Sequence, residues 1–259
     1  MTDASNAART ALVTGATSGI GRATARLLVA EGWRVVGTGR RADRLAELRA
    51  QLGAAFHGAV FDIADEPAMR AALDALPGPF RAIELLVNNA GLGLGTEPAH
   101  EGAVADWRVM VETNILGLLA ITRALLPALI ERRGAVVNLS SVHATWPAPA
   151  NGVYGGTKAF VRQFSLDLRA DLHGTGVRVT SIEPGLVETD FYRVRSGGDQ
   201  QAHDAYYGGT APLRPEDVAA AIAWVAALPA HVNVNSLEIM PVSQSWAGYR
   251  LDRSGEVGR

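Results

Sequence analysis

TGATSGIG, residues 14–21, joins an apolar run at Ala11–Val13 to a helical pattern over Ile20–Glu31. A glycine-rich turn between a buried strand and a helix is typical of dinucleotide-binding folds, because the helix N-terminus offers unpaired N–H groups to a phosphate. Glycines also serve ordinary turns, so this stretch alone does not establish a cofactor site. It predicts the first strand, turn and helix of a larger parallel sheet.

The three glycines of this turn have separate expected roles. Gly15 allows the tight turn, Gly19 lets the backbone approach a pyrophosphate, and Gly21 lets the helix pack closely on the sheet. The other residues of the turn that we assign to the cofactor site are Thr17, Ser18 and Ile20.

Apolar runs and helical patterns alternate along the whole chain. The strand-like runs are Ala11–Val13, Val35–Thr38, Ala59–Phe61, Leu85–Val87, Val136–Leu139, Val177–Ile182 and Leu237–Ile239. The helical segments lie near Ile20–Glu31, Arg44–Leu52, Pro67–Leu76, Val104–Ile130, Val153–Leu172 and Pro215–Leu228. Apolar strands alternating with helices indicate a parallel sheet that is covered on both faces. We predict a single α/β domain over residues 1–259, a Rossmann-type doubly wound sheet whose ligand crevice opens at the strands' carboxyl ends.

Length and composition fit one ordinary globular domain. The chain has 259 residues, of which 48% are hydrophobic and 19% charged. A net charge of −2 gives no excess of basic charge that would point to nucleic acid or anionic lipid. The absence of cysteine excludes disulfides and thiolate metal sites, and the six histidines show no ligand-like spacing, so we expect no metal.

The start of the chain, MTDASNAART, lacks both the basic region and the apolar region of a secretory signal. Two apolar stretches, Gly117–Ile130 and Ala219–Leu228, are interrupted or ended by proline before they could span a bilayer. We therefore expect a cytoplasmic protein without a membrane partner.

The end of the second predicted strand discriminates between the two nicotinamide cofactors. Gly39 stands where an acidic residue would accept the ribose hydroxyls of NAD, and Arg40 and Arg41 follow it. A guanidinium matches the 2′-phosphate of NADP, and a missing carboxylate removes repulsion against it. The alternative is a pair of arginines on a solvated helix start, where arginine is unfavourable. The sequence therefore favours NADP(H).

Tyr154 and Lys158 lie four residues apart in a helical pattern, so we expect their side chains on one face, one turn apart. A free tyrosine has a pKa of about 10, and a nearby ammonium lowers that pKa because it favours the phenolate. Such a pair makes a usable proton-transfer group. The same spacing also occurs in ordinary amphipathic helices, so the pair needs support from other residues.

Ser141 and Asn114 provide this support. Ser141 follows the buried strand Val136–Leu139, which places its hydroxyl at the carboxyl edge of the sheet, where it can hydrogen-bond a substrate carbonyl oxygen. Asn114 lies in a long apolar helix, where a buried amide is costly unless it has partners. A satisfied core asparagine is the alternative explanation of Asn114.

Together these residues resemble the short-chain dehydrogenase/reductase family. Ser141 precedes Tyr154 by thirteen residues and Asn114 precedes it by forty, which are spacings of that family. Each motif is weak alone, whereas the ordered set is specific. The set consists of TG at residues 14–15, GIG at 19–21, Asp62, NNAG at 88–91, Asn114, Ser141, Tyr154, Lys158 and PG at 184–185.

The resemblance implies a role for each matching residue. Tyr154 would donate a proton in reduction and accept one in oxidation, and Lys158 would hold the nicotinamide ribose and lower the pKa of Tyr154. Ser141 would orient the carbonyl, and Asn114 would anchor a proton-relay water near Lys158. The remaining cofactor contacts implied are Asp62 and Ile63 at the adenine, Asn89 on the adenosine side, Val187 and Thr189 at the carboxamide, and Pro184 with Gly185.

Several longer segments resemble one subgroup, the NADP-dependent 3-hydroxy acid dehydrogenases, over almost the whole chain from Thr10 to Trp246. Among them are GTGRRADRL at residues 37–45, LVNNAGLGLGTEPAH at 86–100 and IEPGLVETDF at 182–191. This resemblance implies a small 3-hydroxy acid as substrate, of the serine, L-allo-threonine or 3-hydroxypropionate type.

A substrate with a carboxylate calls for a cation. Arg195, in the glycine-rich segment 188–212, is our candidate, and a solvated loop arginine is the alternative. We expect that segment to be an irregular substrate lid. His143 and Ala144 depart from the small residue and glycine usual in the family, and both can reshape the pocket. We count Ser141 and His143 among the substrate contacts, with a pocket-wall role for His143 favoured over a catalytic one.

Two alternatives to a 3-hydroxy acid dehydrogenase stay open. One is a reductase of another carbonyl class, such as a 3-oxoacyl thioester or a secondary-metabolite ketone, and the other is a non-catalytic NADP(H)-sensing protein. The family resemblance also implies a homotetramer built through the two long helices. The apolar side chains that could form its interface, or else plain core, are Leu118, Leu119, Phe160 and Phe164.

Overall fold

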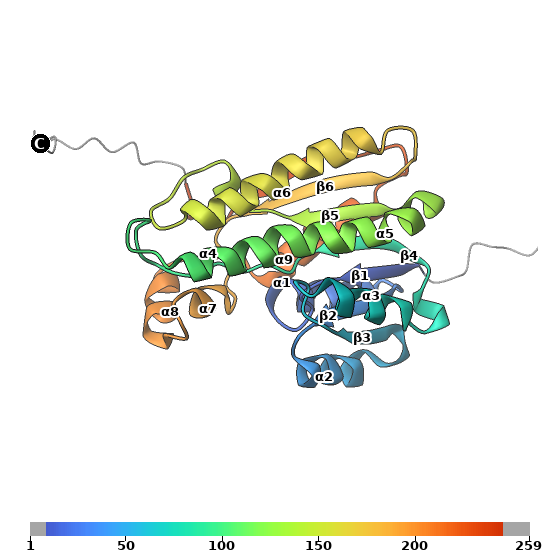
Figure 1. Ribbon diagram of the computed structural model, residues 1–259, viewed down its shortest axis with the longest axis horizontal. Coiled ribbons are helices and arrows are strands. Elements are labelled where there is room, and N and C mark those ends of the chain that lie inside the picture. The colour runs from blue at the N-terminus through green and yellow to red at the C-terminus, as the bar shows by residue number, and fades with distance from the viewer. Residues whose placement is uncertain (1–8, 246–259) are drawn as a thin grey trace, which may run out of the picture.

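The computed structural model describes residues 9–245, in which one seven-stranded sheet lies between two layers of helices (Figure 1). The strands are β1 (Thr10–Val13), β2 (Arg34–Gly39), β3 (Phe56–Val60), β4 (Ile83–Asn88), β5 (Ala135–Leu139), β6 (Arg178–Pro184) and β7 (Ser236–Ile239). Their order is β3-β2-β1-β4-β5-β6-β7, and all neighbours are parallel. Strands are added toward one edge of the sheet from β1 to β3 and toward the other edge from β4 to β7. This switch between β1 and β4 confirms the predicted doubly wound Rossmann-type fold.

Nine α-helices connect or follow the strands in the described part of the chain. They are α1 (Gly19–Ala30), α2 (Ala42–Leu52), α3 (Glu66–Asp74), α4 (Val104–Val111), α5 (Leu118–Arg132), α6 (Gly152–Asp171), α7 (Phe191–Arg195), α8 (Gln200–Tyr207) and α9 (Pro215–Ala227). All seven predicted strands and all six predicted helical segments are present, with ends that differ by at most three residues. The predicted signal-free start lies mostly outside the described residues, because residues 1–8 are not among them.

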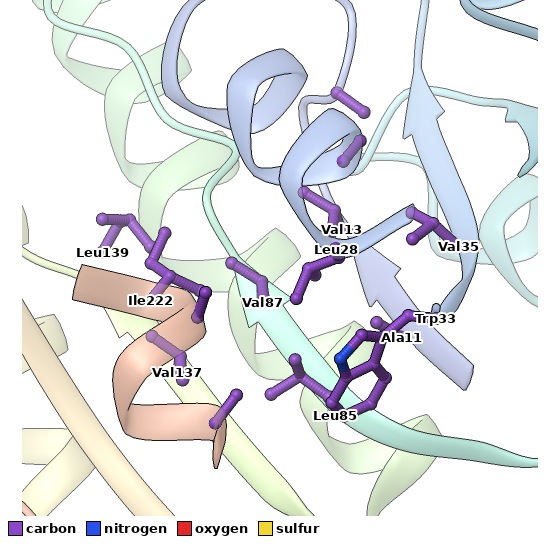
Figure 2. Packing of buried hydrophobic residues seen from close by; sticks show 14 of the residues in the cluster. Ala11, Val13, Leu28, Trp33, Val35, Leu85, Val87, Val137, Leu139 and Ile222 are labelled. Atoms are coloured by element: carbon purple, nitrogen blue, oxygen red, sulfur yellow. The ribbon is translucent and has the colours of Figure 1, made fainter. Parts of the chain in front are cut away.

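Each face of the sheet carries its own apolar core. On one face Leu28 of α1 and Ile222 of α9 lie over Val13, Val87 and Val137 (Figure 2). On the other face helices α3, α5 and α6 cover the sheet, with the side chains Met69, Ile121, Leu125, Leu129 and Leu168. Full burial of one such side chain contributes about 1.5–3 kcal/mol relative to exposure. The two cores fix the carboxyl edge of the sheet, where the loops after β1, β4, β5 and β6 meet.

The helical stretch Val104–Arg132 is, by length and composition, the single segment among residues 9–245 that could cross a membrane, with a mean hydropathy of 1.7. Its α5 part buries Ile121 and Leu129 completely against the sheet. Within the stretch, Leu116 and Ile130 remain exposed. Packing on the sheet therefore accounts for one apolar side of this helix.

The segment 188–212 contains α7 and α8, so the expectation that it is irregular is wrong, whereas its role as a substrate lid stays a prediction. Asp199 caps α8 by accepting a hydrogen bond from the Ala202 N–H. The rings of Tyr192 and Tyr206 stack with 3.8 Å between their centroids and so hold the two helices together. A helix as short as α7 is not stable by itself, and this tertiary contact is not visible as a periodic pattern.

Candidate active site

The turn after β1 is joined to the turn after β4 by hydrogen bonds. Thr14 Oγ1 accepts from the N–H groups of Asn89 and Ala90 at 3.0 and 2.9 Å, and Asn89 Nδ2 donates to the Thr14 carbonyl at 2.8 Å. Gly15 has a φ of 68°, a left-handed conformation that suits glycine. Asn89 therefore shapes the predicted phosphate-binding turn by holding its backbone.

Gly21 lies where no side chain fits. A Cβ atom at this position would overlap Asn89 Nδ2 and the Gly15 carbonyl group, whose carbon would be 2.9 Å away. We expect Gly21→Ala to lower the free energy of unfolding by about 1–3 kcal/mol, as overpacking does, and to weaken cofactor binding. Urea denaturation and NADP titration measure the two effects.

Gly156→Ala is the matched control, because a Cβ at Gly156 of α6 would meet nothing within 4 Å. Alanine in an exposed helix position is expected to leave stability unchanged or to raise it by up to about 1 kcal/mol. Equal stability of the Gly21→Ala and Gly156→Ala variants would contradict the close packing of the turn.

Arg41 binds the phosphate turn directly. Its Nε and one terminal nitrogen donate to Thr17 Oγ1 at 3.2 and 2.7 Å, and the same terminal nitrogen donates to Ser18 Oγ at 2.8 Å. Arg40 is exposed and forms an ion pair with Asp62 at 3.3 Å. The two guanidinium groups and two hydroxyls suit a bound 2′-phosphate, and the nearby carboxylate of Asp62 is already paired.

Gly39 is glycine for a steric reason that the sequence did not reveal. A Cβ atom here would lie 2.6 Å from Thr17 Cγ2, and the hydrogen bonds from Arg41 hold the Thr17 side chain in place. An acidic residue, which would accept the ribose hydroxyls of NAD, therefore does not fit while Arg41 binds Thr17. The residues present fit NADP better than NAD.

The predicted residues after β6 lie next to the phosphate turn. A Cβ at Gly19 would lie 3.2 Å from Thr189 Cγ2, so the start of the lid segment touches the turn. Val187 accepts a hydrogen bond from the Tyr207 hydroxyl at 2.9 Å, and the Gly185 N–H donates to Ile239 in β7. Of the predicted residues after β6, Thr189 therefore lies against the phosphate turn.

Ile63 differs from the other candidates at the adenine end. Its side chain is 8% exposed and belongs to the core cluster under α3 and α5. Asp62 accepts from the Ala64 N–H at 3.0 Å and so shapes the turn after β3. A contact between Ile63 and an adenine would therefore run through the backbone of this turn rather than through the side chain.

The four predicted catalytic residues come together at the carboxyl edge of β4 and β5. Tyr154 and Lys158 lie one turn apart in α6, with 5.8 Å from Lys158 Nζ to the centre of the Tyr154 ring. The Ser141 side chain is close enough to Tyr154 to lower the pKa of its hydroxyl. A Cβ at Gly91 would be 3.1 Å from Lys158 Nζ and 3.3 Å from Asn114 Oδ1, which places both groups around one point.

Asn114 lies in a π-helical turn, Glu112–Gly117, between α4 and α5. Its Oδ1 accepts from the Leu92 N–H at 2.9 Å, and its Nδ2 donates to the Leu92 carbonyl at 2.8 Å and to Thr157 Oγ1 at 3.0 Å. These partners satisfy the buried amide, as a core asparagine requires. π-Helical turns are frequent at functional sites, and here the turn brings the amide to the Lys158 side of the pocket.

Burial dominates the protonation of the catalytic pair. It raises the pKa of Tyr154 to about 12, against the opposing effects of the Ser141 hydrogen bond and the charge of Arg195. Burial also lowers the pKa of Lys158 to about 8. Lys158 was expected to lower the pKa of Tyr154, and this structure differs because Lys158 Nζ donates to the Leu139 carbonyl at 2.8 Å instead.

The raised pKa of Tyr154 predicts opposite pH trends for the two reaction directions. Oxidation needs the phenolate, whose fraction grows with pH below the pKa, so kcat for alcohol oxidation should rise at least tenfold between about pH 6 and about pH 9. Reduction uses the protonated phenol and should not rise. Absorbance of the reduced nicotinamide measures both profiles, and a flat oxidation profile over this range would contradict the prediction.

Arg195 is buried, with 9% of its surface exposed. Its Nε donates to the Gly95 carbonyl at 3.0 Å, and its terminal nitrogens donate to Asn151 Oδ1 at 2.5 Å and to the Ala150 carbonyl at 2.6 Å. A solvated loop arginine is therefore the wrong interpretation. A guanidinium has five N–H groups, so two of them remain for a ligand near Tyr154.

Two residues of the site were missed by sequence reasoning. Phe191 of α7 packs on Tyr154 with 5.2 Å between ring centroids. Ser140 Oγ donates to the Lys158 carbonyl at 2.7 Å and so fixes α6 to the end of β5. Neither contact has a sequence signal, since each joins segments that only the folded sheet brings together.

Comparisons with known proteins identify the family of the chain. Residues 9–198 match the model of the family described as short chain dehydrogenase. The chain is 62% identical over 244 residues to serine 3-dehydrogenase of Agrobacterium fabrum, which covers 94% of this chain and 98% of that protein. It is 52% identical to sulfoacetaldehyde reductase 2 of Chromohalobacter salexigens, with 93% and 98% covered. It is 51% identical to the NADP-dependent 3-hydroxy acid dehydrogenase of Escherichia coli K12, also with 93% and 98% covered.

A solved structure shows the same fold. The closed form of a serine dehydrogenase complexed with NADP⁺ superposes with a TM-score of 0.93 at 50% identity, covering 94% of this chain and 99% of that one. The agreement extends over nearly the whole described chain and includes the sheet edge at which the predicted site lies.

Proposed function

Since the chain belongs to the short chain dehydrogenase family, we propose that it interconverts a small 3-hydroxy acid and its 3-oxo form, with Tyr154 as the acid/base. It is an NADP-dependent oxidoreductase that acts on CH–OH groups. The acids we propose are of the serine, L-allo-threonine and 3-hydroxypropionate type. The observation that carries the proposal is Arg195, a buried guanidinium with two N–H groups left for a carboxylate beside Tyr154.

Proton transfer falls to Tyr154, with the Ser141 side chain beside it. In oxidation the substrate hydroxyl gives its proton to the Tyr154 oxygen, while the Ser141 hydroxyl holds the substrate oxygen in place and stabilises its developing charge. In reduction the Tyr154 proton moves back to that oxygen. NADP, when bound, accepts or supplies the hydride.

Lys158 and Asn114 support this transfer from the protein side. Lys158 carries a proton below its lowered pKa of about 8, so at neutral pH its ammonium can stabilise negative charge that develops on Tyr154 during proton transfer. Asn114 Oδ1 and Lys158 Nζ both lie close to Gly91. We propose that Asn114 anchors a water there, through which Tyr154 recovers its proton. The site also needs no metal for this chemistry, and residues 9–245 contain no cluster of metal ligands.

We propose that the cofactor binds along the carboxyl edge of the sheet, from the phosphate turn after β1 to the start of the segment 188–212. Arg40, Arg41 and Ser18 would hold the 2′-phosphate, and the α1 N-terminus at Gly19 and Ile20 would hold the pyrophosphate. The other residues we assign to it are Gly15, Thr17, Gly21, Asp62, Ile63, Asn89, Tyr154, Lys158, Pro184, Gly185, Val187 and Thr189.

The segment 188–212 acts as a substrate lid in this proposal. Arg195 ties α7 to the loop after β4 through Gly95 and to the loop before α6 through Ala150 and Asn151. Ala150 has a φ of 57°, a conformation that costs energy for a residue other than glycine. These contacts hold the lid over Tyr154. A substrate carboxylate would then accept hydrogen bonds from the two remaining N–H groups of Arg195 inside the pocket.

We also propose a homotetramer formed through α4, α5 and α6. Leu118 is 3% exposed and belongs to the core of the subunit, so the interface would use other residues. The large apolar side chains exposed on these helices are Val104, Val109, Val111, Leu116, Ile130 and Phe160. Light scattering of the purified protein tests this assembly.

A substrate panel tests the proposed reaction. Purified protein with NADP should oxidise L-serine, L-allo-threonine and 3-hydroxypropionate, and Arg195→Gln should raise the KM for each acid while the KM for NADP stays unchanged. Failure with all three acids, together with good reduction of a 3-oxoacyl thioester, a sulfonate aldehyde or another ketone, would favour another carbonyl class. Binding of NADPH with no turnover of any carbonyl compound would favour a sensing protein.

A further inference from the structure

We propose that His143 selects 3-hydroxy acids with an amino group on C2, by accepting a hydrogen bond from that group at Nε2. This inference rests on the proposed function and concerns which acids the site prefers. His143 lies two residues after Ser141, in the short helical turn Val142–Ala144. Its ring meets the ring of Tyr154 edge-on, with 6.1 Å between centroids and 75° between planes. The side chain therefore borders the space in which a substrate on Tyr154 and Ser141 lies.

One ring nitrogen of His143 is already used and the other is open. Nδ1 lies 3.3 Å from the Trp146 carbonyl oxygen. A carbonyl oxygen only accepts hydrogen bonds, so Nδ1 carries the proton, and Nε2 of the neutral ring is an acceptor. Nε2 makes no hydrogen bond to any of residues 9–245. It is available to a donor on the substrate.

The backbone of His143 fixes the position of the ring. Its N–H donates to Ser141 Oγ at 3.2 Å, which couples the turn to the group that orients the substrate oxygen. On the other side α6 closes on the turn, since a Cβ at Gly155 would lie 2.9 Å from the His143 carbonyl oxygen. The distance between the imidazole and the reacting oxygen is therefore set by packed backbone.

The groups around the ring leave the imidazole as the hydrogen-bond acceptor for a substrate ammonium, beside a carboxylate that Arg195 binds. Burial lowers the pKa of His143, the Trp146 carbonyl opposes this, and the charge of Arg195 lowers it further, so the ring stays neutral at pH 7. The groups that face it are Tyr154 from α6 and Arg195 from α7. None of the groups that shift the pKa values of His143 and Tyr154 is a carboxylate. An ammonium on C2 thus finds the imidazole as its acceptor, while Arg195 takes the neighbouring carboxylate.

Two substrates isolate this contact, because L-serine and 3-hydroxypropionate differ only in the ammonium on C2. We expect His143→Ala and His143→Phe, which both lack an acceptor, to lower the ratio of kcat/KM for L-serine to kcat/KM for 3-hydroxypropionate by about tenfold or more, as loss of a hydrogen bond to a charged group does. His143→Gln keeps a carbonyl acceptor and should retain a higher ratio. His173→Ala, at an exposed histidine beyond α6, should leave the ratio unchanged.

The outcomes separate this inference from the proposed function. An unchanged ratio in the variants without an acceptor overturns the role of His143 and leaves the 3-hydroxy acid activity standing. An equal loss for both substrates also overturns it, because the residue then only positions Ser141. If His143→Ala does not fold, the comparison of His143→Phe with His143→Gln decides, and equal ratios overturn the inference. A parent enzyme that oxidises neither acid overturns both proposals.

Discussion

Tyr154→Phe should lower kcat for hydroxy acid oxidation by about 10²–10⁴-fold, the usual contribution of general acid–base catalysis. The variant removes one oxygen and keeps the ring that packs on Phe191 with 5.2 Å between centroids. Folding and NADP binding should therefore persist while proton transfer is lost. Steady-state kinetics in both directions, with NADPH fluorescence for binding, measure the two properties separately.

Tyr192→Phe is the matched control for this change. Tyr192 lies in α7 next to Phe191, but its ring stacks on Tyr206 of α8 and no hydrogen bond joins it to Ser141 among the described residues. Its loss of one hydroxyl should change kcat less than threefold, about 0.6 kcal/mol of activation free energy. If Tyr154→Phe retains the kcat of the Tyr192→Phe variant, Tyr154 is not the acid/base.

Arg41→Ala should raise the KM for NADP by about 10- to 100-fold, as expected when hydrogen bonds to a charged group are lost, and should leave the KM for NAD nearly unchanged. The guanidinium donates to Thr17 and Ser18 in the phosphate turn, so it is positioned for a 2′-phosphate that only NADP carries. Kinetics with both cofactors at saturating hydroxy acid give the ratio directly.

Arg44→Ala controls for the loss of positive charge from the same helix. Arg44 lies in α2 three residues after Arg41 and pairs with Glu47 at 3.4 Å, away from the phosphate turn. It should change the KM for NADP less than twofold, because exposed pairs contribute about 0–1 kcal/mol. Equal effects of Arg41→Ala and Arg44→Ala would mean that general electrostatic attraction, and not a built phosphate site, determines the cofactor preference.

The spacing of apolar residues predicted those strands and helices whose apolar residues are also the ones that the fold buries. Seven apolar runs became the seven strands of the sheet, and the glycine-rich turn at residues 14–21 lies between β1 and α1 as expected. The short helices α7 and α8 escaped prediction, because five to eight residues are stabilised by their tertiary contacts and carry no periodic signal of their own. Element ends shifted because burial and capping, rather than propensity alone, terminate them.

The site divides in the same way. The chemical identities and spacings of Asn114, Ser141, Tyr154 and Lys158 could be taken from the chain order, since spacing within a helix and position after a strand place a side chain on a known edge. The sequence could not tell that Lys158 donates to the Leu139 carbonyl. Nor could it tell that burial raises the pKa of Tyr154 more than the neighbouring groups lower it. Protonation depends on the surroundings in three dimensions, which spacing does not encode.

TGATSGIG illustrates both halves of this division. Residue order alone was sufficient to indicate a strand, a glycine-rich turn and a helix, because a turn with glycines at these positions is typical of dinucleotide-binding folds. The fold was needed to show that Gly21 has no room beside Asn89, and that Thr17, held by Arg41, excludes an acidic residue at position 39. Those constraints join segments far apart in the chain, and only close packing at the switch point of the sheet creates them.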